Sequence, residues 1–424
     1  MKILIKKGRV LDPSCNRDEI ADVLVEDGKI KQVEREITQQ AEKVIDANGC
    51  YVMPGLIDLH VHLRDPGLEY KETIETGCAA AANGGFTSIF AMPNTKPVAD
   101  NPEVITYVQE KAKETGVHVY QVGSVTKGMK GQELSELENM FKAGCMAISE
   151  DGKSVMDSGL YKEAMNLAFQ YNIPVFAHCE DINLVQGGVM NLDEKSKKLG
   201  LKGISNAVED IIVARDILLA KETGARLHLC HCSTKDSVEM IRQAKEEGLK
   251  VTGEVCPHHF TLTSDNIPCD DGNYKMNPPL RQKEDVEALK EGLKNDIMDA
   301  ISTDHAPHSK EEKEGSMTKA AFGIVGLETA VPLTITNLVR TGVITPLQMA
   351  AKMSTNPAKI AGIKGGSLKE GEIADIVVID PEEKYIIDVE QFKSKGRNTP
   401  FGGYEVYGMV KYTISEGTII KGAN

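Results

Sequence analysis

The sequence predicts an α/β protein in which a central (β/α)8 barrel of the TIM type is flanked by a small β-sandwich domain formed from both chain ends. Eight short apolar runs alternate with longer stretches that carry apolar residues at helical spacing. The apolar runs are nearly continuous, as expected for parallel strands that are buried on both faces. The two chain ends lack this alternation and contain short strands joined by turns.

The length of 424 residues suits a barrel of about 250 residues with insertions and a second, smaller domain. We expect residues 1–53 and 366–424 to form the sandwich domain and residues 54–365 to form the catalytic barrel. The net charge of −14 argues against a nucleic-acid-binding surface. No signal peptide or membrane-spanning run is recognisable, and nine cysteines without a CxxC motif indicate reduced thiols. We therefore expect a cytoplasmic protein without a membrane partner.

The chain ends each supply a few strands. The N-terminal segment has a strong hairpin signal at the Asp27-Gly28 pair. The C-terminal segment contains the apolar run 374–381 and a second run, 407–422, with a turn at the Glu416-Gly417 pair. Neither segment has enough strands to bury one face of a sheet, so we expect the two ends to pair with each other.

The middle of the chain supplies eight candidate strands, one for each position of the predicted barrel. They are residues 56–63, 86–94, 117–126, 145–151, 173–181, 225–233, 250–260 and 298–308. The stretches between them have helical periodicity and often end in Gly or Asn, which terminate helices. A doubly wound open sheet predicts similar local patterns, but the count of eight and the positions of the polar residues favour the barrel.

His60 and His62 alternate with apolar residues at the end of the first strand, so their side chains should project from the same face. Two neighbouring imidazoles suit a transition metal such as zinc. Arg64 has the same parity and can bind an anionic substrate beside the metal. The alternative is a pair of histidines on an ordinary sheet face, which only further ligands can exclude.

Four further candidate ligands lie at the carboxyl ends of later strands. They are Asp151, His178, His231 and Asp304. In a barrel these ends meet at one mouth, where active sites lie. Together with the first two histidines they are enough for two metal ions that share a bridging carboxylate. Taken singly, His178 and His231 are more often core histidines with satisfied hydrogen bonds, but their shared terminal position favours the metal site.

The remaining histidines are not assigned to the site. His118 lies at the start of a strand, and His228 and His305 have the parity opposite to that of the nearest predicted ligand. His258 and His259 end the seventh strand, but nothing in their positions assigns them a role.

Five motifs carry most of these polar residues: DLHVHLRDPG (58–67), AMPNT (91–95), HCED (178–181), MNPPLR (276–281) and STDHAPH (302–308). Together they resemble bacterial dihydroorotases of the type I class, in the amidohydrolase superfamily, over nearly the whole chain. The resemblance implies reversible interconversion of N-carbamoyl-L-aspartate and L-dihydroorotate in pyrimidine synthesis. It also implies two zinc ions per chain and a homodimer.

The resemblance divides the candidate ligands into two groups. One zinc ion would be bound by His60, His62 and Asp304, and the other by His178 and His231. Many superfamily members bridge the two ions with a carboxylated lysine, whereas this chain has Asp151 at that strand end, with Lys153 as the alternative bridge. Asp304 would also carry a proton to the departing ring nitrogen.

The resemblance also implies a set of substrate contacts. They are Arg64, Asn94 and His308 for the substrate carboxylate and ring, Asn277 for the ring, and the backbone of Phe322 and Gly323 above it. The polar stretch 309–322 follows the eighth strand and is either a mobile lid or a solvated surface insertion.

Two other functions remain open at this point. A hydantoinase, dihydropyrimidinase or allantoinase would share the metals and the fold, but its substrate lacks the ring carboxylate that Arg64 would bind. A non-catalytic homologue that associates with aspartate carbamoyltransferase would have lost metal ligands, whereas all six are present. We therefore expect an active enzyme, with aspartate carbamoyltransferase as a candidate partner.

Overall fold

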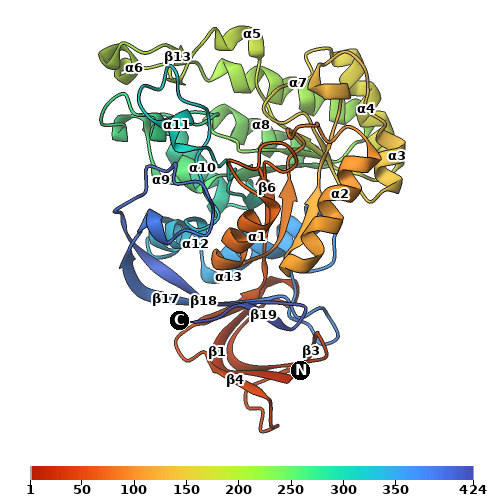
Figure 1. The fold of residues 1–424 in the computed structure, drawn as a ribbon, viewed down its shortest axis with the longest axis vertical. Coiled ribbons are helices and arrows are strands. Elements are labelled where there is room, and N and C mark those ends of the chain that lie inside the picture. Colours follow the sequence, from red (N-terminus) through yellow and green to blue (C-terminus); the bar gives the residue numbers. More distant parts are fainter. Residues whose placement is uncertain (1, 424) are drawn as a thin grey trace.

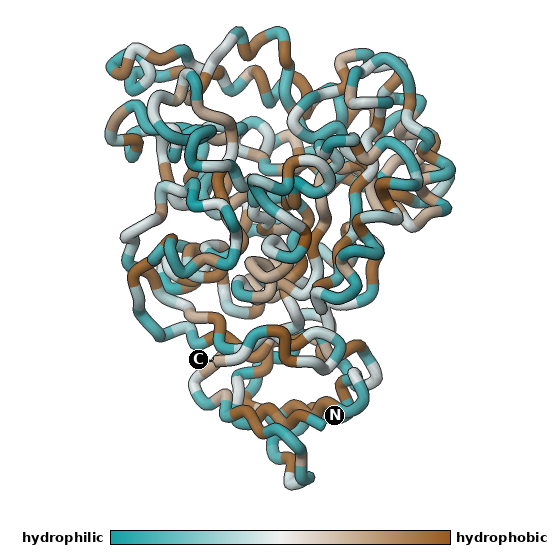
Figure 2. Tube along the Cα trace, viewed as in Figure 1, coloured by the Kyte–Doolittle hydropathy of each residue, from teal (hydrophilic) through white to brown (hydrophobic). Residues whose placement is uncertain are grey.

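The computed structural model describes residues 2–423 and has a basal sheet below a larger assembly of parallel strands and helices (Figure 1). Both ends of the chain lie at the basal sheet. Hydrophobic segments run through this sheet and between the upper helices, and hydrophilic segments predominate in the peripheral loops (Figure 2). No helix in the described part is both long and apolar enough to cross a membrane.

The basal sheet contains strands from both chain ends. Its order is β19-β18-β17-β5-β1-β2-β3, and β4 also pairs with β1. The strands are β1 (Lys2–Asp12), β2 (Arg17–Glu26), β3 (Lys29–Glu34), β4 (Lys43–Asp46), β5 (Tyr51–Pro54), β17 (Ile376–Ile386), β18 (Glu405–Ser415) and β19 (Thr418–Lys421). β17 runs antiparallel to β5, with Ile376 opposite Pro54. The C-terminal strands therefore complete the sheet that the N-terminal strands begin.

Both predicted hairpin turns are confirmed. β2 and β3 are joined at the Asp27-Gly28 pair, and β18 and β19 at the Glu416-Gly417 pair. All four turn residues have positive φ angles, between 47° and 76°. A two-residue turn of this kind matches the right-handed twist of the strands and favours Gly at its second position.

Apart from the small β12-β13 pair, the described upper part contains nine parallel strands in two hydrogen-bonded groups, β6-β7-β8 and β9-β10-β11-β14-β15-β16. They are β6 (Leu56–Val61), β7 (Phe86–Ala91), β8 (His118–Gln121), β9 (Gly123–Ser124), β10 (Ile148–Ser149), β11 (Val175–Ala177), β14 (Leu227–Leu229), β15 (Val251–Val255) and β16 (Ala300–Ile301). Each of the eight predicted ranges contains a strand, and 117–126 contains two. The first strand, β6, and the segment after the last strand, β16, are connected by a parallel bridge between Val61 and His305. In this bridge His62 N donates to the His305 carbonyl at 2.8 Å.

Helices connect the parallel strands, as the alternating pattern predicts. They are α1 (Ile74–Asn83), α2 (Pro102–Ala112), α3 (Leu137–Lys142), α4 (Ser158–Gln170), α7 (Ala207–Thr223), α8 (Lys235–Glu246) and α10 (Lys283–Lys294). After β16 come α12 (Ala330–Thr334), α13 (Pro346–Ala350) and α14 (Asn356–Ala361). The connection between β11 and α7 contains four short elements: α5 (Ile182–Val185), β12 (Met190–Asn191), α6 (Glu194–Leu199) and β13 (Gly203–Ile204).

The observed strands are shorter than the predicted ranges, and one range contains a helix. β15 ends at Val255, and α9 (Pro257–Thr261) follows it, because proline is well suited to the first position of a helix. His258 and His259 therefore lie on a helix, and their assignment to the seventh strand is wrong. Similarly, Asp304 lies in a loop beyond β16 and has a φ of 50°.

Candidate active site

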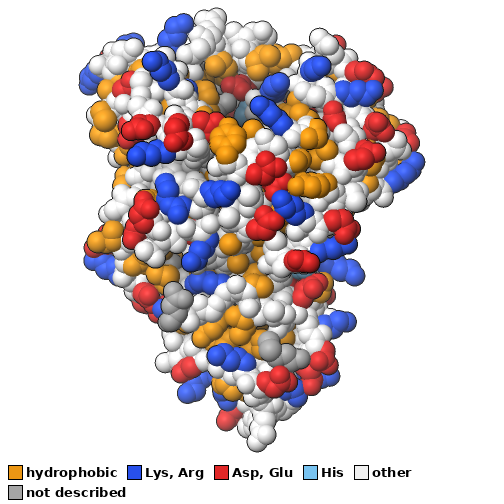
Figure 3. All heavy atoms as spheres, in the orientation of Figure 1, with side chains coloured by type: hydrophobic (Ala, Val, Ile, Leu, Met, Phe, Trp, Pro, Cys, Tyr) orange, Lys and Arg blue, Asp and Glu red, His pale blue; other side chains and the backbone are white. Residues whose placement is uncertain are grey.

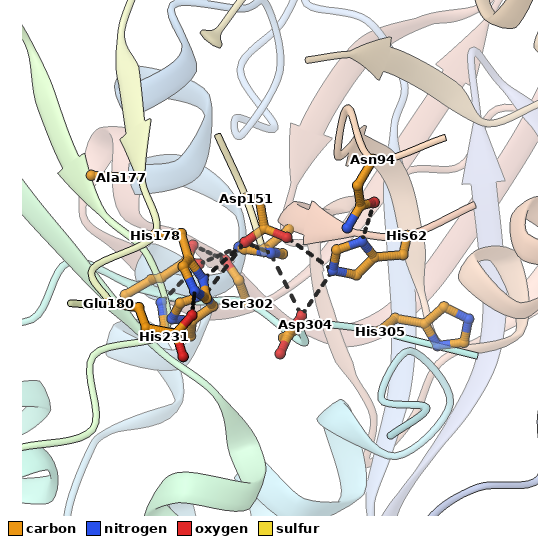
Figure 4. A network of polar contacts seen from close by, with 12 residues as sticks. His62, Asn94, Asp151, Ala177, His178, Glu180, His231, Ser302, Asp304 and His305 are labelled. Carbon is orange, nitrogen blue, oxygen red and sulfur yellow. Dashed lines mark hydrogen bonds and ion pairs between the residues drawn. The ribbon is translucent and has the colours of Figure 1, made fainter. Parts of the chain in front are cut away.

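Imidazoles from three strand ends surround the carboxylate of Asp151, which follows β10 (Figure 4). Oδ1 of Asp151 lies 3.1 Å from His60 Nε2, 3.3 Å from His178 Nδ1 and 3.5 Å from His231 Nε2. Its Oδ2 lies 3.4 Å from His62 Nε2. One carboxylate thus contacts the histidine pair at the end of β6 and a second pair that follows β11 and β14.

Asp304 approaches the first of these pairs from the loop after β16. Its Oδ1 lies 3.2 Å from His62 Nε2 and 3.5 Å from His60 Nε2. All six side chains predicted as metal ligands therefore lie in one cluster. None of the six residues is more than 6% exposed.

The cluster has the chemistry of a metal site. Two groups of ligand atoms, each within 4.8 Å of one another, share one carboxylate: His60, His62 and Asp151, and Asp151, His178 and His231. Both ring nitrogens of the fully buried His60 face carboxylate oxygens, of Asp151 at 3.1 Å and of Glu254 at 3.3 Å, without hydrogen-bond geometry. Buried polar atoms are normally paired, and imidazole nitrogen and carboxylate oxygen are the ligands that zinc takes. The residues present therefore fit a metal centre in which Asp151 is shared.

The neighbouring imidazoles keep both aspartates of the cluster in the carboxylate form. Burial disfavours the carboxylate of Asp151, but the surrounding imidazoles outweigh burial and hold its pKa well below the usual value. Burial acts on Asp304 in the same way, and the hydrogen bond from His62 lowers its pKa to about 2. Both groups are therefore ionised at neutral pH, as a cation site requires.

Glu180 supports the second histidine pair and was not identified from the sequence. His178 Nε2 lies 3.0 Å from Glu180 Oε2, and Asn277 Nδ2 donates to Glu180 Oε1 at 2.9 Å. A carboxylate on the outer ring nitrogen fixes the orientation of a metal-binding histidine. The available signal was the HCED motif, in which Glu180 follows His178 at a spacing of two.

Asn94 and Glu254 support the first pair. Asn94 Oδ1 lies 2.9 Å from His62 Nδ1, so this predicted substrate contact also orients a predicted metal ligand. Glu254, within β15, lies 3.3 Å from His60 Nδ1 and 3.0 Å from His228 Nε2. The sequence analysis missed Glu254, because a glutamate inside a strand gives no distinctive signal.

The remaining histidines lie outside the two ligand groups. His305 points away from the cluster (Figure 4), and its Nε2 lies 3.3 Å from Glu72. His118 lies 3.2 Å from Asp375 at the basal sheet. His259 Nε2 donates to the Pro278 carbonyl at 2.9 Å. The alternative bridge Lys153 also lies outside these groups, and its Nζ donates to the Met129 carbonyl.

Arg64 and His308 lie against each other in a buried corner beside His62, with Arg64 as its cation. Arg64 is 7% exposed, and its Nε donates to the Pro307 carbonyl at 3.2 Å. His308 Nε2 lies 2.8 Å from the Phe322 carbonyl, and its Nδ1 lies 3.3 Å from Lys71 Nζ. A neutral ring with its proton on Nε2 satisfies these two contacts, whereas Arg64 Nη2, 3.3 Å from Nε2, is then a second donor beside the same nitrogen. Burial and the charges of Arg64 and Lys71 lower the pKa of His308 to about 3, in agreement with a neutral ring.

Gly323 lies directly against this corner. Its φ is 122°, and an added Cβ would come within 2.5 Å of the Ala306 Cβ and 3.4 Å of His308 Nε2. The position therefore requires glycine. Phe322 and Gly323 form a wall next to His308, whereas Asn277 lies on the side of Glu180 and Asn94 on the side of His62.

The stretch 309–322 is folded against the rest of the site. It begins with α11 (Lys310–Lys313), and Glu312 accepts hydrogen bonds from the Tyr70 hydroxyl at 3.0 Å and forms an ion pair with Lys71 at 2.8 Å. Lys313 is buried. The stretch is thus more than a solvated insertion, and its action as a lid stays a prediction.

Comparisons with known proteins agree with this geometry. A family model described as "Dihydro-orotase-like" matches residues 49–237. Proteins named dihydroorotase from Acetivibrio thermocellus and Pelotomaculum thermopropionicum are each 50% identical over 99% of this chain and 98% of their own length. Among solved structures, the L-hydantoinase of Arthrobacter aurescens is similar over 100% of this chain and 96% of its own, with a TM-score of 0.89 and 28% identity. The dihydropyrimidinase of Brevibacillus agri covers 100% of this chain and 95% of its own, with a TM-score of 0.87 and 27% identity.

Proposed function

The chain belongs to the dihydroorotase family of cyclic amide hydrolases, and we propose that it interconverts N-carbamoyl-L-aspartate and L-dihydroorotate in pyrimidine biosynthesis. The observation that carries the proposal is the clustering of six candidate metal ligands, with four histidines around Asp151 and Asp304 against two of them, next to the buried guanidinium of Arg64. Metal bound by the ligand cluster can activate a cyclic amide, and the Arg64 guanidinium can bind the carboxylate of the ring.

Two zinc ions are the proposed cofactor. His60, His62 and Asp304 would hold one ion, His178 and His231 the other, and Asp151 would be shared. Zinc bound there would polarise the ring carbonyl and make a nucleophile available at neutral pH. The grouping of the ligand atoms, their burial and the ring nitrogens of His60, which face carboxylates without hydrogen-bond geometry, support this assignment.

The protein groups would hold the substrate and move the proton. Asp304 is ionised at neutral pH, so it can accept a proton and deliver it to the ring nitrogen during hydrolysis; in ring closure the transfer is reversed. Arg64 would bind the substrate carboxylate with its planar fork, which lysine cannot reproduce. The proposed further contacts are Asn94, Asn277, His308 and the backbone of Phe322 and Gly323.

Within the family, we assign the chain to the type I class, because the motif after β10 supplies Asp151 rather than a lysine as the shared ligand. The proposed architecture is a closed barrel at residues 54–365 and a β-sandwich domain made of residues 1–53 and 366–424. The bridge between Val61 and His305 supports closure, and the pairing of β17 with β5 supports the split domain.

We further propose a cytoplasmic homodimer that can associate with aspartate carbamoyltransferase. Homodimers are the commonest oligomers of soluble enzymes. Basic and acidic side chains are interspersed on the face in Figure 3, which together with the net charge of −14 supports the absence of a nucleic-acid partner. Because all six candidate ligands are present, we expect the isolated chain to be active.

Hydrolysis of a hydantoin or dihydropyrimidine ring is the second candidate, because a solved L-hydantoinase and a solved dihydropyrimidinase share the fold at TM-scores of 0.89 and 0.87. The test is a comparison of purified, zinc-loaded protein on dihydroorotate, hydantoin and dihydrouracil. We expect kcat/KM to be highest for dihydroorotate. A preference for either ring without a carboxylate would reject the proposed function.

A further inference from the structure

The loop after β16 contains a lysine whose charged end is buried. Lys313 is the last residue of α11, and only 4% of its surface is exposed. Its Nζ donates to three carbonyl oxygens, those of Lys275 at 3.0 Å, Ala321 at 2.8 Å and Gly323 at 2.8 Å. An ammonium group has three N–H donors, so every donor of Lys313 is used.

Among the described residues, the Lys313 ammonium donates its hydrogen bonds to backbone carbonyl oxygens only. Within residues 2–423, Lys313 makes no ion pair with a carboxylate. Burial and the neighbouring Lys275 ammonium lower the pKa of Lys313 to about 7, and the charge of Asp271 opposes this shift. Three accepting carbonyl oxygens favour the protonated form. A buried cation without a carboxylate is a poor source of stability. We therefore expect Lys313 to serve mainly to fix the positions of the loops whose carbonyl groups it binds.

Lys313 connects two loops that are far apart in the sequence. The Lys275 carbonyl that it binds also accepts from Gly323 N at 3.0 Å. The Gly323 carbonyl also accepts from Asn398 Nδ2 at 3.1 Å. Both lone pairs of each carbonyl oxygen are thus engaged, and the loop of Gly323 is fixed to the loop that leads into Asn277.

A second lysine makes the reverse connection. Lys275 is 5% exposed, and its Nζ donates to the Ala320 carbonyl at 2.6 Å and lies 4.2 Å from the centre of the Phe322 ring. The segment 320–323 is therefore held by Lys313 from within the loop and by Lys275 from across it.

The connected loops carry residues on both sides of the candidate site. The Phe322 carbonyl accepts from His308 Nε2, and the charge of Lys313 contributes to lowering the pKa of His308. Asn277 donates to Glu180, which contacts His178. A displacement of Lys313 would therefore move the Phe322 wall relative to both His308 and Asn277.

We propose that Lys313 is a positioning residue for substrate binding, which holds the backbone of Phe322 and Gly323 at a fixed distance from Asn277 and His308. This inference rests on the proposed function, because the substrate concerned is dihydroorotate. Lys313 contacts no reacting atom and acts through the carbonyl groups that it binds.

The test compares Lys313→Met, which removes all three donors, with Lys310→Met, a change at an exposed position of the same helix. In Lys313→Met we expect KM for dihydroorotate to rise roughly tenfold or more while kcat and zinc content change little, because loss of positioning weakens binding. We also expect faster amide hydrogen exchange at Gly323. Lys310→Met should match the parent in all four measurements.

A folded Lys313→Met protein with unchanged KM and unchanged exchange at Gly323 would overturn the inference. If that variant does not fold, Lys313→Gln, which keeps two N–H donors, is subjected to the same measurements and the same criterion. Failure of the proposed function can be told apart from failure of this inference, because in that case the parent protein itself does not hydrolyse dihydroorotate. In that case the exchange at Gly323 alone decides whether Lys313 fixes the loop.

Discussion

Asp151 Oδ1 lies 3.1 Å from His60 Nε2, although His60 lies in β6 and Asp151 follows β10, with most of three strand-helix units between them. The same oxygen also lies within 3.5 Å of His178 Nδ1 and His231 Nε2. A single carboxylate thus connects two histidine pairs, which is the arrangement that a shared metal ligand needs.

Asp151→Asn should reduce bound zinc, because a neutral amide cannot serve two cations as a carboxylate does. We expect the zinc content, measured by atomic spectroscopy after dialysis, to fall from about two per chain to one or fewer. Lys153→Met is the control, because the Lys153 ammonium binds the Met129 carbonyl outside the ligand groups. Equal zinc loss in both variants, or none in Asp151→Asn, would contradict the assignment of the bridge.

Glu180→Gln should weaken metal binding at the second histidine pair. The amide cannot provide the charged acceptor that orients His178 and also holds Asn277. Changes of this kind typically lower metal affinity or activity by about 10- to 100-fold. Competition with a zinc chelator measures the affinity. Asp181→Asn, at the neighbouring carboxylate that caps α5, should leave it unchanged.

Arg64→Met should raise KM for dihydroorotate far more than it changes the zinc content. The loss of a buried charged hydrogen-bond donor to a carboxylate weakens binding by about 10-fold or more. Arg64→Lys should restore the charge but not the two parallel hydrogen bonds, so its KM should also stay high. Steady-state kinetics with zinc analysis of the same samples provides the comparison, and an unchanged KM in Arg64→Met would place the carboxylate elsewhere.

Asp304→Asn should lose turnover but remain loaded with zinc at the His178 and His231 group. Loss of a positioned proton carrier lowers kcat by about 100-fold or more. Its pKa of about 2 means that the parent group is available as a base throughout the neutral range. Near-parental kcat in this variant would show that another group moves the proton.

His308 should make the protein less stable as the pH falls. The folded-state pKa of about 3 is below the usual value of 6.5, so between these values the unfolded chain binds a proton that the native chain does not. Stability attributable to this residue is therefore complete above pH 6.5 and declines as the pH drops towards 3. His308→Asn, which cannot titrate, should show a smaller drop in Tm between pH 7.5 and pH 5.5 than the parent at equal zinc concentration. An equal drop would refute the burial of a neutral His308.

The sequence alone predicted the strand-helix repeat and the candidate metal ligands. Both hairpin turns, a strand in each of the eight ranges and the convergence of the six candidate ligands were predictable, because they depend on local periodicity and on strand ends. The helix at Pro257 was missed, although proline at a helix start gives a usable signal.

The supporting contacts were not predictable in the same way. Glu254 contacts His60 from inside β15, and Lys313 binds carbonyls of two separate loops. These positions depend on the relative placement of loops with irregular backbone, such as the positive φ of Asp304 and Gly323. Periodicity contains no information about such loops.

Parallel assay of zinc content and dihydroorotate hydrolysis on one purified sample tests the central claim most directly. A two-metal cyclic amidase should bind about two zinc ions per chain, lose activity when a chelator removes them, and regain it when zinc returns. Its kcat/KM should be higher for dihydroorotate than for hydantoin. A chain that carries zinc at His60, His62, His178 and His231 but does not open the dihydroorotate ring would contradict the account.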